Sequence, residues 1–266
     1  MAGAEPFSAA GGPAGALVLH GFTGNPHSMR GIAQRLAAAG LTVELPLLPG
    51  HGTSLEDLLP ARWADWSRAA DEAYSALAAR CDRVAVAGLS MGGSLACWLA
   101  ERHPEIAGLA LVNPAVKPPP DELRAAAQDL LAAGTETAPG IGSDIADPDA
   151  KEVSYEGTPL AAALSLFEGL EEVAARLSAI TCPVLLLSSR QDHIVSPTDG
   201  DFLEANVAGS CERVWLERSY HVATLDYDRA EVEERVEAFV VGVTSPGMAG
   251  ESPLGTAGAS PATAPE

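Results

Sequence analysis

Short apolar runs alternate along this chain with segments whose apolar residues recur every three or four positions. The runs at 16–20, 41–45, 106–113 and from residue 84 onward have the length and composition of buried strands. Helical spacing follows Met29 as far as Gly40 and again covers residues 62–79. Four alternations of strand and helix are typical of a parallel sheet that is covered by helices on both faces.

The alternation stops between Pro114 and about Leu177. Three prolines at 118–120 lead into a helical pattern at 122–133, a glycine-rich acidic stretch and a second helical pattern. The apolar stripe of this second helix is predicted to consist of Leu160, Leu164, Phe167, Val173 and Leu177. Because the segment is too short for a domain, we interpret residues 115–177 as a small cap insertion. Its stripe either packs on the body alone or also lines a substrate pocket as the underside of a lid.

Strand and helix alternate again after the insertion. Strands are expected at 183–188 and 213–217, and helices near 197–207 and from residue 229 to about 240. The pattern thus predicts one α/β domain at 14–243 with a sheet of about six to seven strands. Residues 1–13 are expected to be mostly irregular, with a short edge strand at 6–8. The low-complexity tail at 244–266 is expected to be disordered.

The charge of the chain narrows the range of partners. With 36 acidic and 16 basic residues, the formal net charge of −20 argues against nucleic acid and anionic membranes. The chain has no run of 18 apolar residues and no signal-like start, so we expect a cytoplasmic protein without stable membrane insertion. Neither a zinc site nor a redox pair is suggested by the spacing of the cysteines, Cys81, Cys97, Cys182 and Cys211. The sequence leaves the oligomeric state open.

The run that begins at Val84 ends in a Gly-x-Ser-x-Gly pattern at residues 88–92. A tight turn of this kind between strand and helix holds its serine in a strained conformation with an accessible hydroxyl, and the glycines remove clashes. Leu95 and Leu99 give the following segment helical spacing. Ser90 is therefore the candidate nucleophile, and the alternative is an ordinary turn between buried elements.

A serine nucleophile needs a base that takes its proton and an acid that fixes the tautomer of the base. In hydrolases built on such a turn, the chain order is serine, acid and histidine, with the last two in loops after later strands. Asp192 and His221 follow the strands at 183–188 and 213–217 in this order. Because the carboxyl ends of parallel strands meet at one edge of a sheet, we predict that both side chains reach Ser90.

Other residues compete for these two roles. Asp226 is the rival acid, but it opens the last helical region and suits a turn or cap better. His193 lies on the loop of the predicted acid, which is the wrong loop for the base. Surface helical patterns hold His27 and His103, which we expect to be solvated, and loops at the active edge hold His20 and His51, which we expect to maintain loop shape.

Charge that develops on an attacked carbonyl oxygen needs hydrogen-bond donors already in place. In this arrangement the donors are the backbone N–H after the nucleophile and one from the loop after an early strand. The corresponding residues are Met91 and Phe22. Since the main chain provides both donors, their side chains are expected to act through loop geometry.

Four motifs together resemble the bacterial monoacylglycerol lipases and their short-cap carboxylesterase relatives. The motifs lie at residues 20–26, 48–52, 88–93 and 219–226, and the likeness covers residues 14–242 with the cap runs at 141–144 and 151–156. This resemblance implies an α/β-hydrolase fold with a small mobile cap. It also implies Ser90, Asp192 and His221 as the triad and Phe22 and Met91 as the oxyanion hole.

The resemblance further implies hydrolysis of monoacylglycerols or other lipid esters without a metal or organic cofactor. Ile141 is then expected to wall the acyl channel and Glu152 to accept hydrogen bonds from glycerol hydroxyls; otherwise Ile141 is ordinary cap core and Glu152 a solvated acid. Two alternatives stay open at this point. One is a general carboxylesterase or acyl-thioesterase with the same triad, and the other is a hydrolase fold that has lost catalysis and serves as a binding protein.

Overall fold

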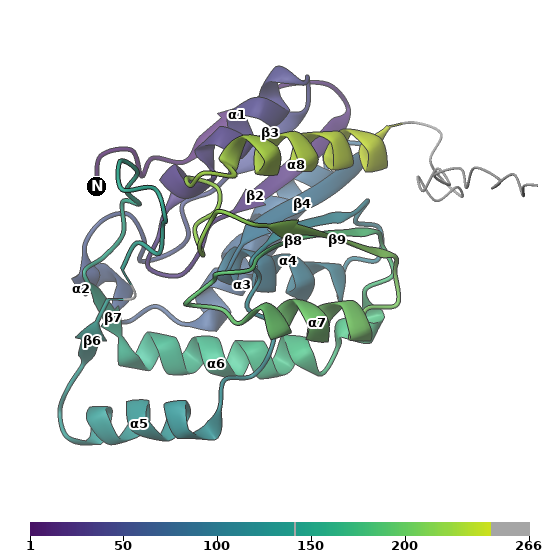
Figure 1. The fold of residues 1–266 in the computed structure, drawn as a ribbon. Helices are drawn as coiled ribbons and strands as arrows, with labels where there is room; N and C mark the ends of the chain where they lie inside the picture. Colours follow the sequence, from purple (N-terminus) through teal and green to yellow (C-terminus); the bar gives the residue numbers. More distant parts are fainter. Residues whose placement is uncertain (141, 246–266) are drawn as a thin grey trace, which may run out of the picture.

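A seven-stranded, mostly parallel sheet forms the centre of the computed structural model, which describes residues 1–140 and 142–245 (Figure 1). Its strands lie in the order β1-β3-β2-β4-β5-β8-β9, and β1 alone runs antiparallel to its neighbour among these described strands. Their bounds are β1 (Phe7–Ala9), β2 (Ala14–Leu19), β3 (Thr42–Leu45), β4 (Arg83–Leu89), β5 (Leu109–Val112), β8 (Val184–Ser189) and β9 (Cys211–Leu216). The predicted parallel sheet is confirmed.

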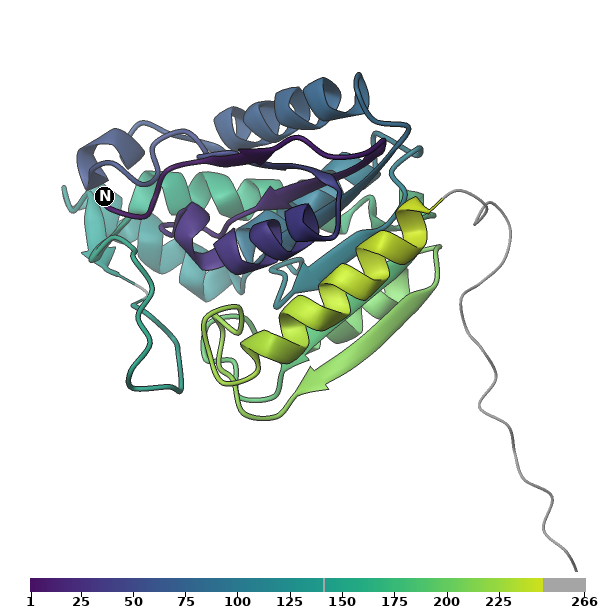
Figure 2. The same ribbon diagram turned by 90° about the horizontal axis from the view of Figure 1, so that it is seen from above.

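Helices cover both faces of the sheet, and the sheet separates the core into two layers (Figure 2). One face carries α1 (Arg30–Ala38) and α8 (Arg229–Thr244), and the other carries α3 (Trp63–Ala78), α4 (Met91–Ala100) and α7 (Pro197–Asn206). Successive residues of a strand point to opposite faces. Accordingly, Leu17 and Leu19 of β2 join the layer that contains Trp66, while Ala16 and Val18 join the layer that contains Ile32.

The long helix α3 shows how the sequence pattern becomes structure. It begins where the side chain of Asp65 accepts a hydrogen bond of 3.1 Å from the backbone N–H of Arg62, which satisfies an amide at the helix start. Among the apolar residues that give this segment its helical spacing, Trp66, Tyr74 and Leu77 are buried. Each such side chain contributes about 1.5–3 kcal/mol by leaving water.

The insertion between β5 and β8 forms two helices and a small hairpin. Its elements are α5 (Asp121–Ala132), β6 (Thr137–Pro139), β7 (Gly157–Pro159), α6 (Leu160–Ala174) and the 3₁₀ helix η2 (Leu177–Ala179). Strands β6 and β7 pair antiparallel, and α5 packs on the outer side of α6 (Figure 1).

The predicted apolar stripe of α6 is partly wrong. Leu160 and Val173 are buried as predicted, and the half-buried Phe167 lines a cavity, as the lid alternative expects. Leu164 is only half-buried, and Leu177 lies beyond the helix in η2. The helix approaches α3 through Gly169, where an added Cβ would lie 2.2 Å from Cδ2 of Trp63. The prediction followed the large apolar residues, whereas the contact depends on a small one.

Three features complete the fold. The short elements η1 (Pro26–Met29) and α2 (Leu55–Leu58) were not predicted, because four residues are too few to show a period. Helix α8 continues to Thr244, into the first residue of the predicted tail, and residues 246–266 lie outside the described part of the chain. In that described part, none of the helices combines the length and the apolar character that crossing a membrane requires.

Candidate active site

Ser90 lies in the sharp turn between β4 and α4. Its backbone has a positive φ of 54° and a ψ of −119°, a conformation that non-glycine residues rarely adopt. An added Cβ at Gly88 would lie 2.2 Å from the carbonyl oxygen of Gly92, and one at Gly92 would lie 2.2 Å from that of Leu19. Both positions therefore require glycine, and the turn holds Ser90 at the carboxyl end of β4 with its side chain partly exposed.

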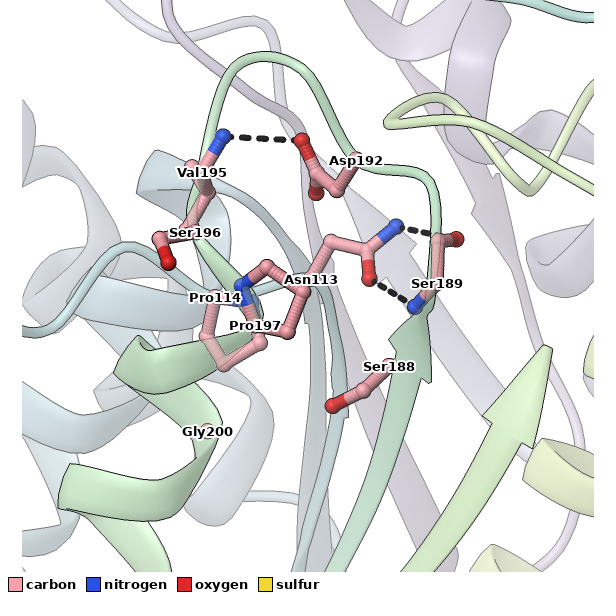
Figure 3. Close-up of a pocket in the computed structure, with 9 residues that line it drawn as sticks. All are labelled: Asn113, Pro114, Ser188, Ser189, Asp192, Val195, Ser196, Pro197 and Gly200. Carbon is pink, nitrogen blue, oxygen red and sulfur yellow. Dashed lines mark hydrogen bonds between the residues drawn. The ribbon is translucent and has the colours of Figure 1, made fainter.

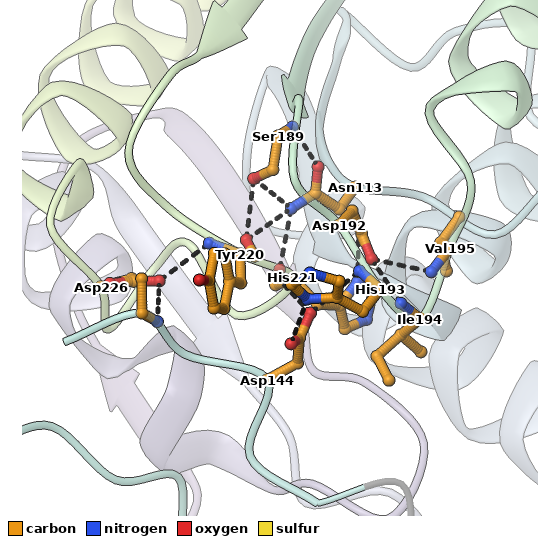
Figure 4. Close-up of polar contacts among 11 residues, drawn as sticks. Asn113, Asp144, Ser189, Asp192, His193, Ile194, Val195, Tyr220, His221 and Asp226 are labelled. Carbon is orange, nitrogen blue, oxygen red and sulfur yellow. Dashed lines mark hydrogen bonds and ion pairs between the residues drawn. The ribbon is translucent and has the colours of Figure 1, made fainter. Parts of the chain in front are cut away.

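The structure brings Asp192 and His221 together. Nδ1 of His221 lies 2.8 Å from Oδ2 of Asp192, and the two side chains are 9% and 1% exposed (Figure 4). Oδ1 of Asp192 also accepts hydrogen bonds of 2.8 Å from the backbone N–H groups of Ile194 and Val195. Since Nδ1–H donates to the carboxylate, Nε2 of His221 is left as the proton acceptor of the ring.

Asp226, the rival acid, has a different set of partners. Its carboxylate accepts hydrogen bonds from four backbone N–H groups, those of Ala146, Asp147, Tyr220 and Tyr227, at 2.7–3.0 Å. The side chain is buried beside the loop that holds His221, but it is Asp192 that meets the imidazole ring. Asp226 therefore connects residues 146–147 of the cap insertion to this loop.

A cavity of about 770 Å³ opens in front of Ser90 and His221. This is within the range of small-molecule sites, about 300–1,000 Å³. Phe22 and Glu152 line the cavity together with these two residues. Most of its apolar wall comes from the insertion, namely Leu123, Ala127, Leu160, Ala163, Leu166, Phe167 and Leu170. Ile141, the other predicted cap residue, lies outside the described residues.

The two predicted oxyanion donors belong to segments beside Ser90. The loop at Gly21 passes so close that an added Cβ would lie 3.5 Å from Cβ of Ser90, and the next residue, Phe22, lines the cavity. Met91 is the first residue of α4, so its N–H is among the amides that have no acceptor within the helix. The positive end of the helix dipole also lies here and favours negative charge.

Two buried histidines maintain the loops around Phe22. Nδ1 of His20 donates to the carbonyl oxygen of Gly21 at 3.0 Å, and its Nε2 accepts from the N–H of Leu48 at 3.1 Å. Because a peptide unit is planar, fixing the Gly21 carbonyl also fixes the direction of the Phe22 N–H. Burial lowers the pKa of His20 to about 4 and that of His51 to about 3, so both rings are neutral at pH 7.

Asn113 is a site residue that the sequence analysis missed. It follows β5 with a positive φ of 43°, and its buried side chain lies between Ser189 and the loop of His221 (Figures 3 and 4). Its Nδ2 donates to Oγ of Ser189 at 2.9 Å and to the carbonyl oxygen of His221 at 2.8 Å, and its Oδ1 accepts from the N–H of Ser189 at 2.7 Å. The available signal was a polar residue with left-handed tolerance directly after a buried strand.

Glu152 is a partly buried acid in the wall of the cavity. Burial raises its pKa to about 7, and the attraction of its carboxylate to His221 opposes this rise. Its Oε1 lies 2.8 Å from the position that a Cβ at Gly24 would take, so the glycine makes room for the carboxylate. The Glu152 side chain is thus half-buried and lines the cavity.

The described residues also bear on metal binding and disulfide formation. Among the described residues, no group of three or more His, Cys, Asp and Glu side chains is arranged to hold a metal ion. The four cysteines are free thiols, and Cys81 and Cys97 are buried.

Sequence comparison relates the chain to known hydrolases. Residues 13–228 match a family described as serine aminopeptidase, S33. The chain is 44% identical over 238 residues to a thermostable monoacylglycerol lipase of Bacillus sp. strain H-257, with 88% of this chain and 93% of the relative covered. It is 27% identical over 238 residues to a carboxylesterase of Bacillus subtilis strain 168, with 89% and 96% covered.

Solved structures give the same relationship for the fold. A structure described under LipS and LipT, two metagenome-derived lipolytic enzymes, superposes with a TM-score of 0.87 at 39% identity and covers 91% of this chain and 99% of its own. The monoacylglycerol lipase of Paleococcus ferrophilus superposes with a TM-score of 0.74 at 18% identity, with 90% and 98% covered. The predicted α/β-hydrolase fold is thereby confirmed.

Proposed function

The chain belongs to the family described as serine aminopeptidase, S33, and we propose that it hydrolyses carboxylic esters through an acyl intermediate on Ser90. As in its monoacylglycerol lipase relative, the preferred esters are monoacylglycerols. One observation carries the proposal. Ser90 in its strained turn and His221, whose ring is paired with Asp192, both line the same mainly apolar cavity. A reacting ester carbonyl fits beside Ser90 while its acyl chain occupies the apolar part.

Acylation begins when Nε2 of His221 takes the proton of the Ser90 hydroxyl as the oxygen attacks the ester carbonyl. Asp192 holds the imidazole in the required tautomer and stabilises the imidazolium that forms. The N–H groups of Phe22 and Met91 bind the oxyanion of the tetrahedral intermediate, each worth about 3 kcal/mol in such sites. Collapse of the intermediate breaks the ester C–O bond, and His221 returns the proton to the leaving alcohol.

Deacylation repeats the same steps with water. His221 takes a proton from the water as it attacks the acyl-Ser90 carbonyl, and the second tetrahedral intermediate expels the Ser90 oxygen, which regains its proton. The products are the alcohol and a free carboxylic acid.

The lining of the cavity supports a lipid ester as the substrate. Leu166, Phe167 and Leu170 give the wall the character that an acyl chain needs, while Glu152 offers an acceptor for hydroxyl groups. We assign Glu152 to the glycerol moiety, while the role of Ile141 in the acyl channel stays a prediction that lies outside the described residues. A cytoplasmic location and the absence of a nucleic-acid partner likewise stay predictions.

A general carboxylesterase or acyl-thioesterase is the second candidate, favoured by the similarity to a Bacillus subtilis carboxylesterase. The two are separated by initial rates on monoacylglycerols, p-nitrophenyl esters and acyl-thioesters of increasing chain length, with Ser90→Ala as the control. A Ser90-dependent maximum on medium or long monoacylglycerols supports the lipase. Activity confined to simple esters or thioesters supports the alternative, and no reaction of Ser90 with an organophosphonate in the folded protein removes both.

A further inference from the structure

Asp144 in the cap segment contacts the loops of both the acid and the base. Its Oδ2 accepts hydrogen bonds from the backbone N–H of His221 at 3.0 Å and from that of His193 at 3.1 Å, and its Oδ1 lies 2.8 Å from Nδ1 of His193 (Figure 4). Its own carbonyl oxygen accepts from the N–H of Val222 at 3.1 Å. The side chain is only 12% exposed, although it belongs to a loop at the protein surface.

Through these contacts Asp144 binds the residue next to the acid and the backbone of the base. His193 is the residue after Asp192, and His221 is held by Asp144 through its own backbone. The backbone of His221 is thus fixed from two sides, since its N–H donates to Asp144 of the cap and its carbonyl accepts from Asn113 of the sheet. A carboxylate acceptor makes these hydrogen bonds stronger than neutral ones, and a buried amide without a partner is costly.

The cap segment that carries Asp144 also carries the acid in the cavity wall. The N–H of Glu152 donates to Oγ of Ser143 at 3.0 Å, which closes the segment on itself next to Asp144. From the other side, Asp226 accepts from the N–H groups of Ala146 and Asp147. The segment at 143–152 is therefore connected to the loop of His221 by carboxylates on both partners.

We propose that Asp144 is a positioning residue that sets the geometry of the Asp192–His221 pair. This geometry then depends on whether the segment at 143–152 is packed against the loop of His221. The proposal rests on the ester hydrolysis proposed above. When the segment leaves its place, the amides of His193 and His221 lose their acceptor, and both loops gain freedom. Displacement of a catalytic group by about 1 Å costs about 100-fold in rate. The cap then acts on the chemical step as well as on binding.

The test compares Asp144→Ala and Asp144→Asn with Asp149→Ala, an exposed acid of the same segment. Each variant is assayed on p-nitrophenyl acetate, too short to need the acyl wall, and on a long monoacylglycerol. We expect Asp144→Ala to lower kcat on the short ester about 10- to 100-fold, Asp144→Asn to lower it less, and Asp149→Ala to leave it unchanged. The downfield proton resonance of the His221 Nδ1–H is expected to weaken or broaden in Asp144→Ala.

A residue that only anchors the cap gives a different result. In that case Asp144→Ala raises KM for the long monoacylglycerol, while kcat on the short ester and the imidazole resonance stay as in the wild type, and the proposal is overturned. If Asp144→Ala does not fold, the same assays are made on Asp144→Asn and His193→Ala. The first weakens the carboxylate contacts, and the second removes the contact between Nδ1 of His193 and Asp144. Failure of the proposed function is distinct, because wild type and Ser90→Ala would then hydrolyse the short ester at the same negligible rate.

Discussion

The amide nitrogen of Asn113 donates a hydrogen bond of 2.8 Å to the backbone carbonyl of His221, 108 residues away in the sequence. The same side chain also exchanges hydrogen bonds with Ser189 at the end of β8, the strand that leads to Asp192 (Figure 3). One asparagine thus joins the ends of β5 and β8 to the loop after β9. This contact holds the loops of the predicted acid and base at a fixed separation.

Replacing Asn113 by aspartate is expected to lower both stability and turnover. The new carboxylate oxygen would face the carbonyls of Tyr220 and His221, where the present group is a donor. We expect a loss of about 1–3 kcal/mol in the free energy of unfolding, measured in urea, and a lower kcat. Asn113→Gly is the comparison variant, because it keeps the left-handed backbone at no steric cost and removes the hydrogen bonds without adding the repulsion, so it should lose less stability than Asn113→Asp. Equal stability of Asn113→Asp and the wild type would contradict this account.

Asp192→Asn and Asp226→Asn are expected to differ sharply. The first permits the wrong tautomer of His221 and should lower kcat by a factor on the order of 10⁴. The second weakens backbone contacts of a buried carboxylate and should mainly lower the melting temperature. Steady-state rates and thermal melts of both variants provide the measurement. Unchanged turnover in Asp192→Asn would return the role of acid to Asp226.

The raised pKa of Glu152 predicts a pH-dependent loss of stability. Its folded pKa of about 7 exceeds the ordinary value of 4.5, so the folded state binds the proton more tightly than the unfolded state. The contribution is fully present below pH 4.5 and is lost as the pH rises to about 7, by at most about 3 kcal/mol. Glu152→Gln should escape this loss and gain in relative stability from pH 4.5 to 8 in urea unfolding. Glu156→Gln, at an exposed position four residues further along the chain, is the control substitution.

Two helical glycines provide a matched pair of alanine substitutions. Gly169→Ala places a Cβ 2.2 Å from Trp63 and pushes α6 away from α3, so we expect a loss of about 1–3 kcal/mol. The same shift moves Leu166 and Leu170 in the cavity wall and should raise KM for long-chain esters. Gly242→Ala meets no atom within 4 Å in α8 and should stabilise the protein by about 0.4–1 kcal/mol. Urea unfolding of the two variants measures the difference in sign.

The sequence predicted the parts of the fold that depend on local periodicity. The stripe of α3 and the runs of β2, β4 and β8 are visible in a few consecutive residues, and their bounds in the structure lie close to those expected. The expectation for His103 was less accurate, because it ignored one carboxylate that is distant in the sequence and another that is two residues away. His103, expected to be solvated, lies 2.6 Å from Asp71 and 3.3 Å from Glu105.

The candidate site shows the same division. Ser90 and its glycines form a local motif, and the chain order of Asp192 and His221 follows a known arrangement. Asn113 and Asp144 could not be predicted in this way, because each acts on His221 across 108 and 77 residues respectively. Their contacts with His221 are tertiary, and apart from the position of Asn113 directly after a buried strand they leave no period or spacing in the sequence.

Helix α6 both connects two strands of the sheet and lines the cavity, which limits how the cavity can be altered. Strands β5 and β8 are parallel neighbours, so the chain must return from the carboxyl edge of the sheet to its amino edge, and α6 makes most of that crossing. The same helix supplies Leu160, Leu166 and Leu170 to the cavity. An engineer can therefore reshape the cavity by exchanging side chains on α6, but cannot delete or shorten this helix without breaking the connection. The outer helix α5 contributes Leu123 and Ala127 to the same cavity, so its side chains offer a second place at which the cavity can be reshaped.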